Sequence, residues 1–408
     1  MSNFDYRSYL KNNPLLEELP KGEWVDLDKK EELLFTKEHK ATALESARKG
    51  IVLLKNNGIL PLQKTTSKKN IFVTGPNANN QSILGDWHAA QPDENVTTIY
   101  EGIKALGETK GYSVNYFNSG ENIRKIKDSK IKEATKRAKN ADFAIVVVGD
   151  NSMRYKWKDK TAGENMARAS LDLFGKQLDL IQAIKKTGTP VIIVLVNGKP
   201  ISEPWLQKNI PAIIESWEPG NLGGQAVAEI VFGDVNPSGK LPLTVARSVG
   251  QLRMIYNHKP SAYFHKYADV KKTPLYPFGY GLSYTNYKYS KPLLSNTTLN
   301  KEDKIIVTTE ITNTGEVDGE EIAQLYIRDN VSSVTRPVKE LKGYQRVFLK
   351  AGETKKIKFT INSESLAFYD INMNYVVEPG TFTIMTGSSS NDKDLKKTIL
   401  SINKKIKL

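Results

Sequence analysis

Two runs of residues, 143–148 and 191–196, are apolar at every position and constrain the fold more than any other feature of the sequence. A strand that is apolar throughout is buried on both faces, which is typical of the inner strands of a parallel sheet covered by helices. Shorter runs at 71–74 and 212–214 alternate with segments of helical periodicity. This alternation predicts an α/β domain, a layered α/β sandwich whose sheet is mostly parallel.

The first helical pattern begins at Thr36, which can cap a helix, and repeats apolar residues at Ala43, Ala47, Ile51 and Leu54. We expect this helix to run to the turn at 56–58 and the first strand to be 71–74. The remaining predicted helices are 96–106, 123–140, 177–187 and 223–232, and the remaining predicted strands are 112–117, 143–148, 191–196 and 212–214.

From Lys304 onward the hydrophobic period becomes two, with Ile305, Val307 and Ile311 on one face. Similar segments follow at 322–328, 344–349, 356–361 and 382–385, separated by turns rich in glycine. Several short strands at this spacing predict an all-β sandwich of immunoglobulin or fibronectin III-like size. We expect the lysine-rich tail after Asn391 to be partly mobile.

These patterns divide the chain into four predicted segments. Residues 1–35 form a linker or arm, 36–245 the α/β sandwich domain, 246–290 a connecting segment, and 291–408 the β-sandwich. The connecting segment is rich in proline and tyrosine and has weak periodicity, so we expect it to pack on the domain surface.

Charge alone indicates no particular partner, although a general preference for anionic surfaces or anionic substrates stays open. Lys and Arg number 59 against 45 acidic residues, which gives a net charge of +14. The basic stretch at 124–139 contains no aromatic residue for base stacking, so a solvated helix face explains it better than a nucleic-acid site. No apolar run approaches the ~18 residues of a membrane helix, and no secretory signal follows Met1. We therefore expect neither a nucleic acid nor a membrane as partner.

The composition also restricts the chemistry. The absence of cysteine excludes thiolate metal sites and thiol catalysis, and the four histidines form no ligand pair at helical spacing. We therefore expect no metal or other cofactor.

The long loop after the run 143–148 carries the candidate catalytic groups, because ligands bind where parallel strands end. It contains Asp150, Glu164 and Arg168. Glu164 could act as a general acid if its surroundings raise its pKa, although a solvent-exposed loop glutamate is the more frequent explanation. In a second loop, Trp87 could stack on a sugar or base, or it could be a packed anchor.

Several motifs in these regions are familiar. The most specific are Phe-Gly-Asp-Val-Asn-Pro-Ser-Gly-Lys-Leu-Pro at 232–242 and Tyr-Pro-Phe-Gly-Tyr-Gly-Leu-Ser-Tyr at 276–284, with weaker ones at 45–62, 74–78, 84–87 and 196–200. They resemble the second domain of family 3 glycoside hydrolases, the β-glucosidase/β-xylosidase group. Residues 335–344 and 378–380 resemble that family's fibronectin type III-like module. The matches run in order from about residue 40 to 390.

The resemblance implies a retaining hydrolase that uses two carboxylates on an oligosaccharide or other β-glycoside. Gly163-Glu164, followed by Arg168, resembles the family's acid/base loop, so Glu164 inherits the acid/base role. Trp87 resembles the aromatic residue that lines the aglycone side of the site. Arg168 would orient Glu164 or contact the substrate.

The chain also departs from the family pattern. The family's nucleophile is an aspartate on an N-terminal barrel of about 250 residues, which residues 1–35 cannot form. Asp86 belongs to the second-domain motif at 84–87 and is not that nucleophile, and residues 153–161 match no family pattern. The resemblance therefore implies a β-glucosidase-like glycoside hydrolase whose nucleophile lies on an absent or separately encoded barrel polypeptide. The alternatives are a β-xylosidase of the same family and a non-catalytic carbohydrate-binding or scaffold remnant. The family often acts in the periplasm or outside the cell, yet this chain shows no export signal, so its location stays open.

Overall fold

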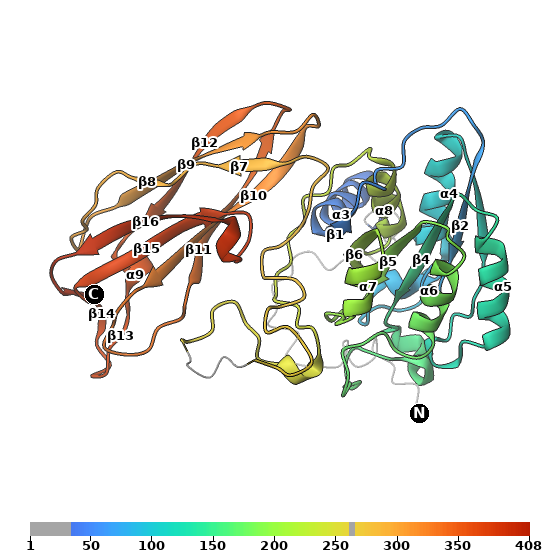
Figure 1. The fold of residues 1–408 in the computed structure, drawn as a ribbon, viewed down its shortest axis with the longest axis horizontal. Coiled ribbons are helices and arrows are strands. Elements are labelled where there is room, and N and C mark those ends of the chain that lie inside the picture. The colour runs from blue at the N-terminus through green and yellow to red at the C-terminus, as the bar shows by residue number, and fades with distance from the viewer. Residues whose placement is uncertain (1–33, 261–265) are drawn as a thin grey trace, which may run out of the picture. The chain divides into compact units, whose positions relative to one another are not determined.

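The computed structural model describes residues 34–260 and 266–408 (Figure 1). Nearly all of the predicted arm, 1–35, lies outside the described residues. The first part of the chain forms a six-stranded sheet in the order β1-β6-β5-β4-β2-β3, in which every neighbouring pair is parallel except β1 with β6. Its strands are β1 Val52–Asn56, β2 Lys69–Thr74, β3 Tyr112–Phe117, β4 Phe143–Gly149, β5 Val191–Val196 and β6 Ala212–Trp217. The predicted α/β class with a mostly parallel sheet is confirmed.

Helices cover both faces of this sheet, which explains the apolar runs. Ile145 and Val147 of β4 belong to a core shared with α4 and α8, whereas Val146 and Val148 belong to a second core shared with α5 and α6. Both sets are fully buried. The helices are α3 Lys37–Gly50, α4 Ile99–Thr109, α5 Asp128–Ala138, α6 Gln177–Lys185, α7 Pro204–Asn209 and α8 Gly223–Phe232. A strand with no exposed face has no position for a polar residue, and so β4 and β5 were recognisable from their sequence.

The prediction for the first helix and first strand was wrong. Helix α3 ends at Gly50, and Val52–Asn56 is the edge strand β1, paired antiparallel with β6. The apolar spacing of Ile51 and Leu54 fits a helix, but both of these residues are buried at or in the strand. Burial on two faces removes the alternation that distinguishes a strand from a helix in the sequence.

Other predicted boundaries shift by a few residues. The predicted helix at 123–140 is divided into a 3₁₀ turn, Ile123–Lys125, and α5 from Asp128. The helix expected at 96–106 begins at Ile99, because Thr98 caps it and Glu101 completes a capping box with that residue. The strand expected at 212–214 continues to Trp217, which positions two glutamates described below.

The second part of the chain is an antiparallel β-sandwich, as predicted. One sheet has the order β11-β10-β15-β16, and another has the order β12-β9-β7 with β8 paired to β9. Their inward side chains form one core, which includes Val307, Leu325 and Ile384. The bounds are β7 Tyr287–Tyr289, β8 Leu293–Leu294, β9 Ile305–Asn313, β10 Gly319–Asp329, β11 Glu340–Leu349, β12 Thr354–Ile361, α9 Ser363–Leu366, β15 Gly380–Gly387 and β16 Leu395–Ile402.

The expectation of a partly mobile tail was wrong. Residues after Asn391 form β16, which pairs along its whole length with β15, and β17 Ile406–Lys407, which pairs with β14 Tyr375–Val377. Strand β14 also pairs with β13 Phe368–Tyr369. Leu400 and Ile402 of β16 are buried in the sandwich core, whereas Lys396 and Lys397 at its start and Lys404 and Lys405 after its end are exposed. The basic composition of this tail is therefore compatible with an ordered strand.

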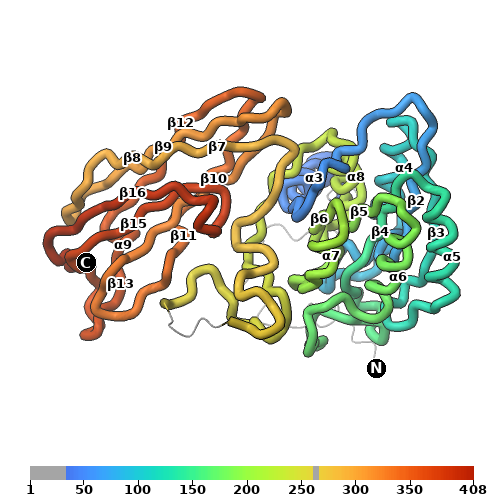
Figure 2. Tube along the Cα trace, in the orientation of Figure 1, coloured from blue at the N-terminus to red at the C-terminus, as the bar shows by residue number. Residues whose placement is uncertain are grey.

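The connecting segment, residues 246–290, contains few regular elements among its described residues, and Figure 2 shows it in yellow as a mostly irregular trace. Short bridges fix it, with Tyr276 paired to Val245 and Leu282 paired to Leu53. The division of the chain at 245 and 290 stays a prediction. No helix in the described part of the chain combines the length and apolarity that a membrane crossing requires.

One buried carboxylate joins the segments before and after this connection. Glu321 of β10 is 2% exposed and accepts a hydrogen bond from the Tyr289 hydroxyl at 2.9 Å. The Nζ of Lys240 lies 3.1 Å from its other oxygen and also donates to the Gly281 carbonyl. The charge on Glu321 is therefore neutralised by a lysine from the α/β part of the chain.

Candidate active site

The loops that follow β2, β4, β5 and β6 meet at the carboxyl edge of the parallel sheet. A cavity of about 350 Å³ lies at this edge. Asp86 comes from the loop after β2, Arg168 from the loop after β4, Lys199 from the loop after β5, and Glu218 directly follows β6. The sheet therefore brings together side chains that are up to 132 positions apart in the sequence (218 − 86). This is the usual location of a site in an open parallel sheet.

Glu164 lies beside this cavity with its side chain 41% exposed. Its carboxylate forms an ion pair with the guanidinium of Arg154. Its main-chain amide donates a hydrogen bond to the carboxylate of Asp86. The backbone of Glu164 is thus fixed to the protein while the carboxylate faces outward.

The buried pair of Asp86 and Lys160 holds this loop in place. Lys160 is fully buried, and its Nζ lies 2.9 Å from Asp86 Oδ1 and 3.1 Å from the carbonyl oxygen of Glu164. Burial tends to raise the pKa of Asp86, but hydrogen bonds from Lys160 and the Glu164 amide bring this pKa below its usual value. Asp86 therefore remains ionised, and both of its oxygens are engaged in positioning Glu164.

Gly163 is the turn residue that lets the loop approach this pair. Its φ is +96°, and a Cβ at this position would lie 2.5 Å from Asp86 Oδ2 and 3.2 Å from Lys160 Nζ. A side chain would be strained by the backbone angle and would also displace the buried pair. The loop therefore requires glycine at position 163, directly before Glu164.

Trp87 and Glu164 both contact the side chain of Arg154. The guanidinium carbon of Arg154 is 3.7 Å from the centre of the Trp87 ring system, while the same guanidinium pairs with Glu164. The indole is 76% exposed. An exposed ring whose described contact is a cation–π pair does not fit the packed-anchor explanation, and it leaves apolar surface accessible beside the carboxylate.

Arg168 is held by other groups. It donates to Asp150 Oδ1 at 2.9 Å and to the carbonyl of Asp172 at 2.7 Å, and Lys199 lies 3.1 Å from the second oxygen of Asp150. The side chain of Arg168 is 9% exposed and lines the cavity. In the described residues Arg154, and not Arg168, forms the ion pair with Glu164. A contact between Arg168 and substrate stays a prediction.

Two glutamates at the end of β6, the buried Glu215 and the partly buried Glu218, were not singled out from the sequence. Burial raises the pKa of Glu215 to about 8, although it accepts hydrogen bonds from Trp217 and Asn197. Burial also raises the pKa of Glu218, which accepts a hydrogen bond from the Ser152 hydroxyl at 2.5 Å. The only available signal was Glu215 itself, a charged residue directly after the apolar run Ala212, Ile213 and Ile214.

This arrangement can exchange a proton at one exposed carboxylate, Glu164, beside an exposed aromatic surface. The neighbouring carboxylates are less exposed than Glu164 and are held by other residues: Asp86 by Lys160, Asp150 by Arg168, and Glu218 by Ser152. No group of three or more histidines and carboxylates that could hold a metal ion is found in residues 34–260 and 266–408. The described residues thus place one exposed carboxylate beside an exposed indole at the carboxyl edge of the sheet.

Comparisons with known proteins give the same picture. The model of the glycosyl hydrolase family 3 C-terminal domain matches residues 51–284, and the model of the fibronectin type III-like domain matches residues 321–390. A "Beta-xylosidase" of Formosa agariphila is 42% identical over 379 residues, which are 90% of this chain and 51% of the relative. A "Periplasmic beta-glucosidase" of Salmonella typhimurium is 38% identical and covers 86% of this chain and 49% of the relative.

Solved structures agree with these matches. A β-glucosidase from Listeria innocua superposes with a TM-score of 0.84 at 28% identity, over 95% of this chain and 52% of that chain. A β-glucosidase of intestinal bacteria involved in saponin metabolism also gives a TM-score of 0.84, at 32% identity over 92% of this chain and 56% of that chain. The chain thus spans about half the length of the curated relatives it matches.

Proposed function

Because this chain belongs to glycosyl hydrolase family 3, we propose that it supplies the acid/base carboxylate for retaining hydrolysis of terminal β-D-glycosyl residues, as in a β-glucosidase. Glu164 is the acid/base, and the nucleophile comes from a barrel domain outside this sequence. The observation that carries the proposal is the position of Glu164, with its main chain anchored by the buried Asp86–Lys160 pair and its carboxylate exposed beside Trp87.

Each half of the reaction needs a different form of Glu164. In the first half, protonated Glu164 gives its proton to the glycosidic oxygen as the bond to the anomeric carbon breaks. In the second half, the ionised carboxylate removes a proton from the water that releases the sugar. The carboxylate of Glu164 is paired with Arg154, and this ion pair has to open before the carboxyl group can donate to the glycosidic oxygen.

Trp87 and Arg168 are proposed to bind the substrate. The exposed indole of Trp87 offers an apolar face for the leaving part of the substrate, next to the atom that Glu164 protonates. The guanidinium of Arg168 lines the cavity, fixed by Asp150, and can donate to a sugar hydroxyl there.

The proposal leaves two candidates, glucose and xylose, for the sugar that is released. The relatives described above include a β-xylosidase and a β-glucosidase, at similar identity. The residues of this chain contact mainly the leaving side in our proposal, whereas the sugar that forms the covalent intermediate would be held by the barrel. Both aryl β-glucosides and aryl β-xylosides therefore belong in the test.

The experiment mixes this chain with a purified family barrel and measures turnover of glycosides that differ in leaving group. We expect activity in the mixture and background in either component alone. Glu164→Gln should lower kcat about 10²-fold or more for a substrate with a poor leaving group such as cellobiose. The loss should be much smaller for the first step with a dinitrophenyl glycoside, whose leaving group needs no proton. Glu94→Gln, an exposed glutamate of a neighbouring loop, is the matched control.

A uniform loss across leaving groups would show that Glu164 is only structural. Failure of every mixture to exceed background, with glycan binding unchanged by Glu164→Gln, would contradict the enzyme and favour a non-catalytic carbohydrate-binding protein.

A further inference from the structure

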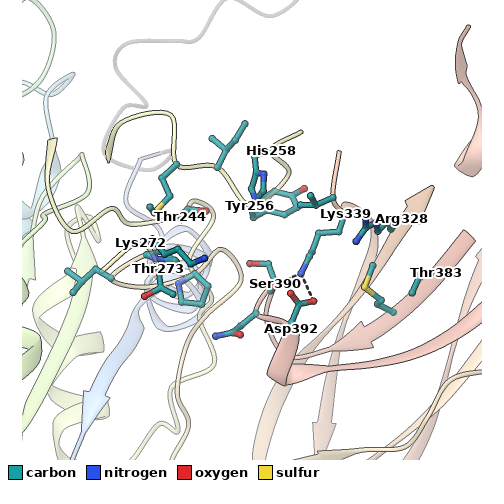
Figure 3. Close-up of a pocket in the computed structure, with 18 of the residues that line it drawn as sticks. Thr244, Tyr256, His258, Lys272, Thr273, Arg328, Lys339, Thr383, Ser390 and Asp392 are labelled. Atoms are coloured by element: carbon teal, nitrogen blue, oxygen red, sulfur yellow. Dashed lines mark hydrogen bonds and ion pairs between the residues drawn. The ribbon is translucent and has the colours of Figure 1, made fainter. Parts of the chain in front are cut away.

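A larger cavity lies away from the carboxyl edge of the sheet, between the connecting segment and the β-sandwich (Figure 3). Its volume is about 820 Å³, which is within the range of pockets that enclose a whole small molecule. Lys272 and Thr273 line it from the connecting segment, and Arg328, Lys339 and Asp392 line it from the sandwich. None of these residues takes part in the site around Glu164.

The lining of this cavity is strongly basic. Its charged residues are Arg247, Lys272, Arg328, Lys339 and Lys397 against the single carboxylate Asp392, a difference of four positive charges (5 − 1). Asp392 Oδ1 already accepts hydrogen bonds from Lys339 and Lys397, both at 3.0 Å. That carboxylate therefore cannot neutralise the cations on the opposite wall.

The lysine at the base of the cavity is fixed. Lys339 is 7% exposed, and its Nζ donates to the Ser390 carbonyl at 2.8 Å as well as to Asp392 (Figure 3). Lys272 and Arg328, by contrast, are exposed. They line the cavity from different walls, because Lys272 belongs to the connecting segment and Arg328 to the sandwich, 56 positions later in the sequence (328 − 272). Two separated cations suit a ligand with two anionic groups.

The rest of the wall mixes polar residues with an apolar part that includes a rigid aromatic ring. Tyr256 stacks on Phe278 with ring centres 4.2 Å apart and an interplanar angle of 19°, and its hydroxyl accepts a hydrogen bond from the Leu341 amide. Met254 and Met385 line the cavity near it. A fixed aromatic ring next to cations offers both a surface for a ring and partners for its charged substituents.

We propose that this cavity binds a small ligand that carries two or more anionic groups on a ring with an apolar face, such as a sulfated or uronate disaccharide. The proposal is independent of the proposed function, since it concerns different residues and is tested by binding instead of turnover. Lys272 and Arg328 contact the anionic groups, and Tyr256 contacts the ring. Lys272 and Arg328 are exposed to solvent, so salt screens their attraction for an anion, and the affinity should fall as the salt concentration rises.

The test is isothermal titration of the full chain with a sulfated disaccharide, a uronate disaccharide and inorganic phosphate, at about 20 mM and about 200 mM salt. We expect saturable binding of at least one disaccharide and much weaker binding of phosphate, which lacks the ring. Lys272→Gln/Arg328→Gln should weaken the disaccharide about tenfold or more. Thermal melting of this variant checks that the chain stays folded.

The matched control is Lys271→Gln/Lys396→Gln. These residues neighbour Lys272 and Lys397 in sequence and are exposed, but they do not line the cavity, so the control removes two positive charges from the same region. It should change the affinity less than about twofold. Equal losses in the two variants, phosphate binding as tight as the disaccharides, or no saturable heat with any of the three probes would each overturn the proposal.

Discussion

The two hollows of this molecule differ in how their charges are compensated. At the carboxyl edge of the sheet, Asp86 is paired with Lys160, Asp150 with Arg168, and Glu164 with Arg154. In the cavity beside the connecting segment, five cations face one carboxylate, Asp392, which already pairs with Lys339 and Lys397. Charges paired within the chain hold a geometry, whereas an excess of one sign attracts a ligand of the opposite sign. The first hollow is thus suited to positioning one reactive group and the second to recruiting an anion.

The largest loss of stability should follow from removal of one partner from a buried ion pair at the carboxyl edge of the sheet. Lys160→Met leaves the carboxylate of Asp86, 11% exposed, without its nearest cation, and Arg154 at 3.5 Å is the cation that remains. We expect the free energy of unfolding to fall by about 3 kcal/mol, the lower end of the usual cost of removing one partner from a buried pair. Urea unfolding followed by tryptophan fluorescence measures it, because Trp87 and Trp157 lie in the affected loops.

Two further variants calibrate that result. Lys158→Met removes an exposed lysine from the same loop and should leave the unfolding midpoint unchanged. The double variant Asp86→Asn/Lys160→Met removes both charges and should recover part of the loss. If the single variant costs less than about 1 kcal/mol, the pair does not anchor the loop as described.

The stability of the folded chain should decrease as pH rises, because the buried carboxyl group of Glu215 is neutralised by a bound proton and not by a cation. Because the pKa of buried Glu215 is raised to about 8, the folded chain holds a proton there that the unfolded chain releases near pH 4.5. This group therefore contributes its full stability below about pH 4.5 and loses it as pH rises toward 8, by about 1 kcal/mol per pH unit.

Glu215→Gln should remove this slope. The difference in unfolding free energy between variant and parent should grow from pH 5 to pH 8 in favour of the variant, to about 3 kcal/mol. Urea midpoints at four pH values test it. A pH-independent difference would mean that Glu215 is ionised in the folded chain, with Asn197 and the Trp217 amide as sufficient partners.

A smaller effect should follow from crowding the buried pair without changing any charge. Gly163→Ala combines a positive φ with a Cβ contact at 2.5 Å to Asp86. Gly188→Ala is the control, because Gly188 has a similar φ of +89° and open space around it. We expect a loss of about 1 to 3 kcal/mol for Gly163→Ala and less for the control. Equal losses would attribute the whole effect to the backbone angle.

The smallest effect should come from a pair that lies in solvent. Arg137 pairs with Glu133 on α5 at 2.8 Å, and both side chains are well exposed. We expect Arg137→Gln to leave the unfolding midpoint unchanged, because exposed helix pairs contribute little. A loss comparable to that of Lys160→Met would mean that burial does not distinguish the two kinds of ion pair.

Local patterns predicted the elements whose environment is uniform along their length. Strand β5 and helix α8 have the predicted bounds, 191–196 and 223–232, because every position of β5 and every position of α8 except Gln225 is buried. Strand β1 was missed because three buried apolar residues after a helix fit either structure. Short apolar runs carry no periodicity that could separate the two.

The site was predicted less completely than the fold. Glu164 and Trp87 could be proposed because they lie in motifs that resemble a known family, and the structure places them on either side of Arg154. Arg154 and Lys160 were missed since they lie in the stretch that fits no family motif. Lys160 meets Asp86 across 74 positions of sequence (160 − 86), and no spacing rule predicts a contact made by tertiary folding.

The buried carboxylate of Glu321 restricts which recombination events the two halves of this chain can tolerate. It requires Lys240 from one half of the chain and Tyr289 from the junction. A recombination event that exchanged only the sandwich would place an acidic side chain opposite a surface without its matching lysine, or the reverse. The two halves are thus expected to descend together, and a shuffled chimera would have to carry both ends of this contact across the crossover point.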